Sequence, residues 1–548
     1  MLMLLLLSGI ILQVLSHSHR TCISDQIKAN HRTIQIQHVS TRHMAEVHRV
    51  PIEGLHAGEQ EEETPKWRQM RIFVDYSLCE EAEAKNPAIK AANLVNLKLM
   101  KSAVTYYEKA FQVFHMERMN FEGGECRAGE KVPAFSKKVD LFIKFFPGDL
   151  GGSLAAAMPC YSTFDGRSII GAYYIDYKTI KTSRVQEYFN FSTYTHEIGH
   201  ILGFLESEFS NFVSHSLKRN LRLNEVVGQS VIDGVTFKTI VMPGVVAYAR
   251  EYFKCPTLTG VPLEDNGNSG TKNSHWEKLF LAGEYMDPSE ENPGMISMFS
   301  LKFFEGTGWY KIVGKPYEPY SWGKGAGCGH FRVCPKSPGY CSKAQEGNPT
   351  CSMDFLSKGQ CASGDEMNGC FKNHPLKHSC LFEKGDEESH STQPGEFYGA
   401  GSRCVETQNE EGEIVPRCQL AQCKKNAVVY NFPSETAVCT KTGQIVITKD
   451  HKLTCPDITK FCLRRSEFNC PKDCSGNGVC FVDRKCFCFA SHKGSACSSK
   501  KRLTYQNMKN WLGLKHLRAA LQFMQLKNQI RHRGTRARLI LELLKNLH

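Results

Sequence analysis

Two histidines four residues apart, His196 and His200, place the strongest constraint on how this chain folds. Residues at that spacing lie on one face of an α-helix, so both imidazoles can reach a single ion. Neutral imidazoles suit Zn²⁺, and the adjacent Glu197 is placed to take a proton from water on that ion. Gly203 then supplies a residue that ends such a helix. The pattern HExxHxxG therefore predicts a metal-binding helix, preceded by the aromatic and apolar run 185–195.

A catalytic zinc keeps three protein ligands and one open position, so a third ligand must come from elsewhere in the chain. The most compact arrangement would place it three residues after Gly203, where the sequence has Glu206. A glutamate further along, Glu225, and the nearby His215 are alternatives.

A more distant histidine, His275, is the better candidate for the third ligand. It lies eleven residues before Met286, which precedes Asp287 and Pro288. Some zinc sites have a tight turn beneath the metal, with a methionine side chain as an apolar floor for the ligands. Met286 suits that turn, and a histidine shortly upstream of such a turn favours His275.

With these motifs in place, the chain resembles the leishmanolysins, which are zinc metalloproteases of the metzincin type. The resemblance spans roughly residues 67 to 460. Its matching segments are His196 to Phe204, Gly270 to Trp276, Met286 to Pro288, Ala155 to Cys160 and Trp322 to Cys328.

In that family a long insertion displaces the third histidine. The resemblance implies that His196, His200 and His275 bind one zinc ion, that Glu197 is the general base and that Met286 forms the Met-turn. Glu206, His215 and Glu225 then become ordinary residues of the insertion.

The pattern of apolar residues predicts the elements around this helix. Residues 70–76, 139–146 and 169–175 have the composition of strands, whereas 92–116 carries apolar residues at helical spacing. Strands before and after one long helix fit the N-terminal half of a metzincin. An edge strand there would be able to pair with an extended peptide substrate.

We therefore expect an α+β fold, with a metzincin-like catalytic domain that is split by an insertion. A loop-rich, disulfide-stapled C-terminal domain and an EGF-like module follow it. The expected segments are a signal peptide (1–16), a propeptide (17–66), an N-terminal catalytic subdomain (67–205), the insertion with the third ligand and the Met-turn (206–310), the Cys-rich domain (311–465), the EGF-like module (468–498) and a tail (499–548).

Cysteine usage indicates an exported protein. The chain has 24 cysteines, and nineteen of them lie between Cys328 and Cys497. This density is normal only where disulfides persist, and the irregular spacings up to Cys462 disfavour zinc knuckles. The apolar run 2–15 has the shape of a signal peptide and is too short for a comfortable transmembrane span. We expect a secreted protein or one on the outer cell surface, with no transmembrane helix or lipid-anchor signal.

Cys22 stands apart, just after the expected signal peptide. Leishmanolysins carry a similar propeptide segment, in which a Cys thiolate can occupy the open zinc position and hold the enzyme latent. Here Thr21 is inserted between Arg20 and the Cys. The alternative is an ordinary disulfide, since the remaining cysteines are odd in number.

Six closely spaced cysteines near the C-terminal end resemble an EGF-like module: Cys470, Cys474, Cys480, Cys486, Cys488 and Cys497. That resemblance implies pairing of the first with the third, the second with the fourth and the fifth with the sixth. Such modules space domains or bind partners and carry no chemistry.

The tail is strongly basic. Residues 499–548 contain twelve Lys or Arg and one acid, so they supply +11 of the chain's formal net charge of +12. Leucines recur there at helical spacing, as in a basic amphipathic helix that binds an anionic membrane surface or a glycan. The alternative is a solvated terminal helix without a partner. Nucleic acid is a poor candidate partner for an exported chain.

These features predict a zinc metalloendopeptidase that hydrolyses protein or peptide substrates with zinc-activated water and Glu197 as general base. The alternative is a surface adhesion or binding protein that uses the protease fold and the EGF-like module as a scaffold. The oligomeric state cannot be read from these patterns.

Overall fold

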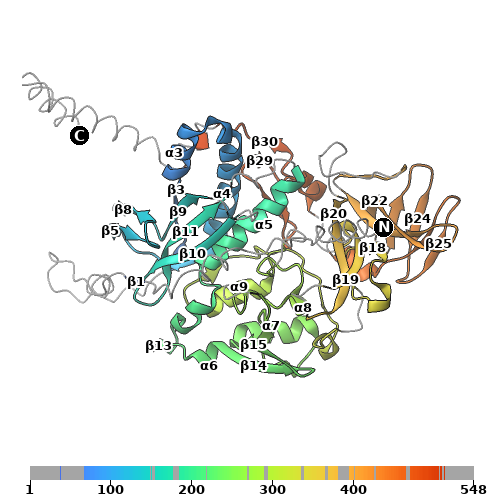
Figure 1. The fold of residues 1–548 in the computed structure, drawn as a ribbon, viewed down its shortest axis with the longest axis horizontal. Coiled ribbons are helices and arrows are strands. Elements are labelled where there is room, and N and C mark those ends of the chain that lie inside the picture. Colours follow the sequence, from blue (N-terminus) through green and yellow to red (C-terminus); the bar gives the residue numbers. More distant parts are fainter. Residues whose placement is uncertain are drawn as a thin grey trace, which may run out of the picture.

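The computed structural model describes residues 37–38 and 67–511 (Figure 1), with gaps at 149, 151–154, 177–183, 218, 268–270, 289–293, 335–338, 364–367, 381–393, 400, 425–426, 464–469, 505–506 and 509–510. The expected signal peptide, Cys22 and the tail beyond Trp511 lie outside the described residues. Within the described ranges, no helix combines the length and the apolar character that a bilayer span requires.

A five-stranded sheet is the central element of the N-terminal half. Strands β3 (Ile72–Asp75), β9 (Leu141–Pro147) and β11 (Ser168–Ile175) are parallel, and β10 (Ala155–Ser162) is antiparallel to β11. Every residue of β10 and β11 is buried, which explains their nearly continuous apolar sequence. The short β1 (Gln37–His38) pairs in parallel with Tyr161 and Ser162, on the outer edge of β10.

Two long helices cover this sheet, α4 (Lys90–Ala110) and α5 (Arg184–Ile201). They pack directly on each other, and the Tyr107 hydroxyl of α4 donates a 2.6 Å hydrogen bond to the Thr195 carbonyl of α5. Helix α5 contains both histidines of the HExxH motif, so the sheet and α4 together position the metal-binding helix.

The helix predicted over 92–116 is wrong at its C-terminal end. The chain leaves the helix after Ala110 and forms β4 (Phe111–Phe114), between β2 (Trp67–Gln69) and β17 (Lys311–Ile312). Phe111 and Val113 are buried while Gln112 and Phe114 are half-buried, which is the two-residue period of a strand. Strand pairing over long sequence distances therefore overrode the helical period.

The insertion after Gly203 forms a subdomain of its own. It contains η2 (Glu206–Asn211), the sheet β14 (Val227–Ile232), β15 (Val235–Ile240) and β16 (Val261–Pro262), and helix α7 (Pro243–Phe253). Helix α9 (Met298–Gly306) packs against α7. In Figure 1 this subdomain lies below the central sheet.

The Cys-rich domain was expected to be loop-dominated, and this expectation is wrong, because it contains two sheets. One has the order β18-β19-β20 and the other β24-β23-β22-β21-β26-β25. Their strands are β18 (Pro349–Cys351), β19 (Ser357–Ser363), β20 (Phe371–Ser379), β21 (Ser402–Gln408), β22 (Ile414–Lys424), β23 (Ala427–Asn431), β24 (Thr436–Cys439), β25 (Ile445–Ile447) and β26 (Lys452–Thr454).

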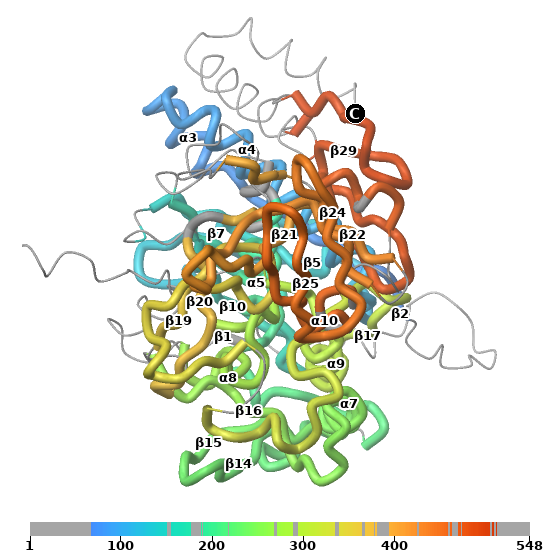
Figure 2. Tube along the Cα trace, turned by 90° about the vertical axis from the view of Figure 1, so that its right-hand side faces the viewer, coloured from blue at the N-terminus to red at the C-terminus, as the bar shows by residue number. Residues whose placement is uncertain are grey.

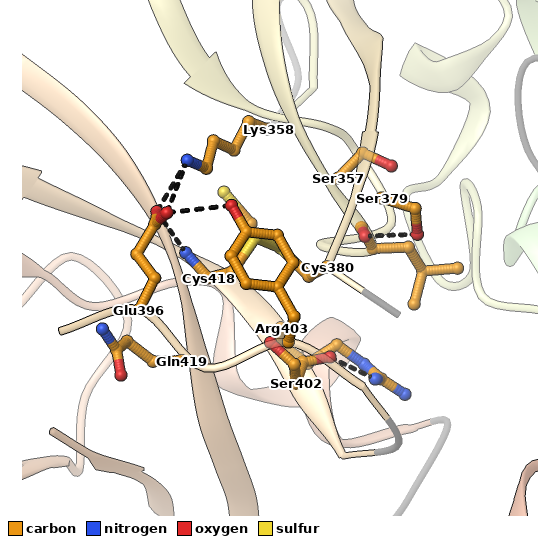
Figure 3. Close-up of a disulfide and its surroundings, with 12 residues drawn as sticks. Ser357, Lys358, Ser379, Cys380, Glu396, Ser402, Arg403, Cys418 and Gln419 are labelled. Carbon is orange, nitrogen blue, oxygen red and sulfur yellow. Dashed lines mark hydrogen bonds and ion pairs between the residues drawn. A yellow bond between two sulfur atoms is a disulfide. The ribbon is translucent and has the colours of Figure 1, made fainter. Parts of the chain in front are cut away.

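A buried ion pair lies beside one disulfide of this domain, Cys380–Cys418 (Figure 3). The carboxylate of Glu396 accepts hydrogen bonds from the Lys358 ammonium at 2.7 and 2.9 Å and from the Cys418 amide at 3.1 Å. Both charged side chains are at most 9% exposed. These bonds give the buried charges partners, which they need away from water.

Eleven disulfides connect the described cysteines, and Cys79, buried in α3 (Ser77–Lys85), is outside them. Of the 24 cysteines, only Cys22 then remains, outside the described residues. The six-cysteine module (470–497) has the bridges Cys470–Cys480, Cys474–Cys486 and Cys488–Cys497, in the order that the EGF resemblance implies.

This module packs against the helices of the N-terminal half. Phe489 is fully buried, and its ring centroid lies 5.2 Å from that of Phe191 on α5. The Ala490 amide donates a 2.9 Å hydrogen bond to the Ser102 hydroxyl on α4. Beyond the module, Met508 is fully buried in the same core. The module and the first residues of the tail therefore share one hydrophobic core with α4 and α5, and Figures 1 and 2 show them beside α4.

Candidate metal centre

Helix α5 brings the first two candidate ligands together. The Nε2 atoms of His196 and His200 lie 3.0 Å apart, with the ring planes nearly perpendicular. Since the two residues are one helical turn apart, the backbone alone places both rings on one face of α5.

His275 completes the group from the far end of the insertion. Its Nε2 atom lies 3.3 Å from that of His196, and one ring nitrogen from each of the three histidines falls within 4.8 Å of the others. Four-coordinate zinc with Zn–N bonds of roughly 2.0–2.1 Å requires ligand nitrogens about 3.3 Å apart. The three nitrogens therefore fit a tetrahedral ion that keeps one open position.

Backbone carbonyls orient all three rings. Nδ1 of His196 donates to the Tyr285 carbonyl at 2.6 Å, and Nδ1 of His200 donates to the Phe204 carbonyl at 2.7 Å. Nδ1 of His275 donates to the Thr271 carbonyl at 3.0 Å. A neutral imidazole with its proton on Nδ1 keeps a lone pair on Nε2. These contacts therefore direct three metal-binding lone pairs toward one point.

Gly203 is required for one of these contacts. Its φ of +115° lets the chain reverse after α5, and the Phe204 carbonyl then returns to His200. A Cβ atom on Gly203 would meet the Trp309 ring at 2.8 Å. The glycine therefore ends the helix, as the sequence predicts, and also makes room for Trp309.

The centre is dry. His200 and His275 are fully buried, and His196 is 8% exposed. Burial lowers the pKa of His196 to about 4, although its hydrogen bond to the Tyr285 carbonyl opposes this shift. His196 is thus neutral at physiological pH, which is the form that binds a metal. Glu197 follows it on α5 and is 1% exposed, so its carboxylate is also held away from bulk water.

A tight turn carries Met286 under α5. The Asp287 amide donates to the Glu284 carbonyl at 2.9 Å, and the Trp276 amide donates to the Met286 carbonyl at 3.0 Å. Because the Tyr285 carbonyl accepts from His196, one turn is tied both to the metal-binding helix and to the residue after His275. The Met286 side chain is fully buried, and its sulfur atom lies against Gly199 of α5.

A buried carboxyl that the sequence analysis missed supports this turn. Glu284 accepts hydrogen bonds from the hydroxyls of Ser297 at 2.6 Å and Ser300 at 2.8 Å and from the Met286 amide at 2.6 Å. The Ser300 hydroxyl also accepts from the Trp276 indole at 2.9 Å. Burial raises the pKa of Glu284 to about 7. The sequence feature that could have pointed to Glu284 is an acidic residue within an apolar segment, two positions before Met286.

Two further buried carboxyls, those of Glu264 and Glu277, lie beside the third candidate ligand, His275. The Glu264 amide donates to the His275 carbonyl at 3.0 Å, which holds the main chain of the ligand. Burial, and then the neighbouring Glu264, raise the pKa of Glu277 well above its ordinary value. The sequence analysis also missed this pair, because Glu264 and His275 meet only through the folded insertion.

The alternative third ligands lie in other surroundings. Glu206 forms an ion pair with Lys238, and Glu225 forms one with Arg219 at 2.7 Å. Nε2 of His215 lies 2.5 Å from the Gly308 carbonyl. None of these three side chains belongs to the histidine group.

Comparison with known proteins agrees with this geometry. Residues 134–374 match the family model of the peptidase M8 group, leishmanolysin. This range contains the three histidines, Glu197 and Met286.

Three curated relatives have similar segments. The ciliated left-right organizer metallopeptidase of Danio rerio is 27% identical over 266 residues, which cover 46% of this chain and 41% of the relative. The leishmanolysin-like peptidase of Drosophila melanogaster is 29% identical over 243 residues (38% of this chain, 36% of the relative). The leishmanolysin homolog of Crithidia fasciculata is 33% identical over 177 residues (32% and 25%). The chain thus spans less than half the length of these relatives.

Proposed function

The chain carries a leishmanolysin domain, and from this premise we propose that it is a zinc metalloendopeptidase. The observation that carries the proposal is the convergence of three imidazole nitrogens, with Glu197 buried beside them. Zinc is preferred over other metals because three imidazoles with one open position are the donor set of catalytic zinc.

His196, His200 and His275 would hold the ion. When bound, zinc supplies Lewis-acid polarisation of the scissile carbonyl and lowers the pKa of the attacking water. Glu197 would take the proton from that water and deliver it to the leaving amine. Without β1, which comes from the expected propeptide, strand β10 would be the edge of the sheet and would offer backbone groups to an extended peptide.

The test is cleavage of casein by the purified full-length chain, with a chelator and after zinc is restored. Glu197→Gln keeps the shape of the side chain and removes the proton acceptor. Zinc content should therefore stay normal, while kcat falls by a factor on the order of 10²–10⁴. Glu225→Gln is the matched control at an ion-paired residue of the insertion and should leave kcat unchanged.

Two results would contradict this assignment. Near-normal turnover by Glu197→Gln would show that another group is the base. A zinc-loaded wild-type chain that cleaves no protein or peptide, even after removal of the pro-segment, would favour a scaffold that serves adhesion.

We place the enzyme outside the cell or on its outer surface. Eleven disulfides support this location, because such bridges persist only in oxidising compartments.

We also propose that Cys22 holds the precursor latent by occupying the open zinc position. The bridges and the buried Cys79 account for all other cysteines, which leaves the Cys22 thiol for this role. Strand β1 supports the proposal, because it comes from the expected propeptide and covers part of the outer edge of β10. Cys22→Ser precursor should be active without cleavage, and thiol-reactive mercurials should activate the wild-type precursor. A correctly folded but inactive Cys22→Ser precursor would rule out the switch.

The basic tail beyond Trp511 is proposed to bind anionic membrane surfaces. Truncation after Trp511, rather than at 499, leaves the packed Met508 in place. This truncation should abolish salt-sensitive binding to anionic vesicles and leave peptidase activity unchanged. Equal vesicle binding by both proteins would identify the tail as a solvated terminus.

A further inference from the structure

A basic cavity lies where the six-cysteine module meets α4. Its volume is about 290 Å³. The charged or titratable residues that line it are all basic: Lys101, Lys109, His492, Lys493 and Lys501. No Asp or Glu is part of the lining among the residues that the structure describes.

The four lysines come from separate parts of the chain that folding brings together. Lys101 and Lys109 lie on α4, whereas Lys493 belongs to β29 (His492–Lys493). Lys501 follows β30 (Ser499–Lys500), which pairs with β29, and its amide donates to the Ser491 carbonyl at 2.7 Å. The hairpin thus places two lysines opposite the two on α4.

Aromatic rings lie close to the ammonium groups of the two lysines on α4. The Lys101 ammonium lies 5.3 Å from the centroid of the Trp511 ring, and the Lys109 ammonium lies 5.7 Å from that of Phe487. Both distances are within the range of cation–π attraction. The charged groups are therefore positioned by packing and remain able to receive a ligand.

Bringing these lysines together is electrostatically unfavourable. Partial burial, and then the charge of Lys501, lower the pKa of Lys101. Glu108 is the carboxylate that opposes this shift, and it also accepts a hydrogen bond from the Ile72 amide at 3.2 Å. The module docks in spite of the repulsion because Phe487 and Phe489 are buried against the helices. An anion in the cavity would remove the repulsion.

We propose that this cavity binds a sulfate ester group of an extracellular glycan. A tetrahedral oxyanion accepts charge-assisted hydrogen bonds from several ammonium groups at once. The volume is close to the lower end, roughly 300 Å³, of small-ligand sites. A sulfated sugar on a flexible chain can enter a recess, whereas a bilayer presents its headgroups in a plane. This inference rests on the proposed location outside the cell, which the disulfides support and where such glycans occur.

The experiment measures binding of inorganic sulfate and of a sulfated disaccharide to the full-length chain by calorimetry. The test variant is Lys493→Glu/Lys501→Glu, which changes two exposed residues of the lining. The matched control is Lys472→Glu/Lys485→Glu, which makes the same change in net charge at exposed residues of the same module outside the lining. Peptidase activity should be the same in both variants, because neither pair lies at the metal centre, and a cooperative thermal transition checks that both variants are folded.

The proposal predicts that the test variant raises the Kd of the disaccharide about tenfold or more, since two charge-assisted hydrogen bonds are lost. The control should keep the wild-type Kd. Equal weakening in both variants would show that only net charge matters and would overturn the site, as would a wild-type chain that does not bind the disaccharide. Binding to anionic vesicles that depends on Lys493 and Lys501, without disaccharide binding, would assign the cavity to a lipid headgroup instead.

Discussion

The Sδ atom of Met286 lies 2.7 Å from the point that a Cβ atom on Gly199 would occupy. Gly199 stands between Glu197 and His200 in the HExxH motif, and Met286 occupies the turn whose carbonyl groups hold His196 and Trp276. The absence of a side chain at position 199 thus lets the Met-turn approach α5 directly beneath the ligands.

Gly199→Ala tests this relationship. The added methyl group cannot fit unless Met286 moves, and overpacking of this kind costs about 1–3 kcal/mol. We expect a lower Tm and reduced zinc occupancy, measured by calorimetry and by metal analysis. The control is Gly244→Ala on α7, where an added Cβ meets nothing within 4 Å. This control should be neutral or stabilising by up to about 1 kcal/mol. An unchanged Tm and zinc content in Gly199→Ala would show that Met286 can move away from the added methyl group at little cost.

The third ligand is tested by alanine substitution. His275→Ala removes one of three converging nitrogens, so zinc occupancy and activity should both be lost. Glu206→Ala, Glu225→Ala and His215→Ala should retain zinc, because their side chains lie in other contacts. Metal analysis of the four purified proteins decides between them. Zinc loss in one of the last three, with normal zinc in His275→Ala, would move the ligand to that residue.

The pH dependence of stability should reveal Glu284. Burial disfavours the charged carboxylate and raises the pKa of Glu284 from its ordinary value of 4.5 to about 7. The folded protein therefore keeps a proton between these values that the unfolded chain has lost. This contribution to stability is complete below pH 4.5 and disappears as the pH rises through 7.

Glu284→Gln carries no titrating group, so it should lack this decline. Relative to wild type, its free energy of unfolding should improve by up to about 3 kcal/mol between pH 4.5 and 8. Denaturant unfolding of both proteins with a chelator present measures this difference without a contribution from the metal. Parallel pH profiles for the two proteins would show that Glu284 does not titrate in this range.

The six-cysteine module should unfold together with the catalytic core. Phe489→Ala removes a fully buried ring that contacts Phe191, so it should cost about 3–5 kcal/mol and reduce peptidase activity. Phe397→Ala is the control, because Phe397 is 43% exposed and should change stability by only about 0.5 kcal/mol. A separate, earlier unfolding transition of the module with full activity retained would contradict a shared core.

Local spacing alone determined the parts of this protein that depend on neighbouring residues. His196, Glu197 and His200 share a helix because four residues make about one turn. Gly203 ends that helix because a positive φ is available to glycine at little cost. The close spacing of the six cysteines from Cys470 to Cys497 likewise indicated a compact module held by disulfides.

Contacts between distant residues were decided only by the tertiary structure. The sequence favoured His275 as the third ligand over Glu206, Glu225 and His215, but only the folded insertion shows how it comes close to His196. The spacing of apolar residues predicted that the helix continues through Phe111–Phe114, where the structure has a strand. The prediction failed because this spacing carries no information about strand partners that lie far away in the chain. The hydrogen bonds of the Glu284 carboxyl and the packing of Phe489 on α5 also join residues that are distant in the sequence, so they were not predicted. Such contacts depend on which surfaces meet after folding, and the residues on either side of them in the sequence carry little information about their partners.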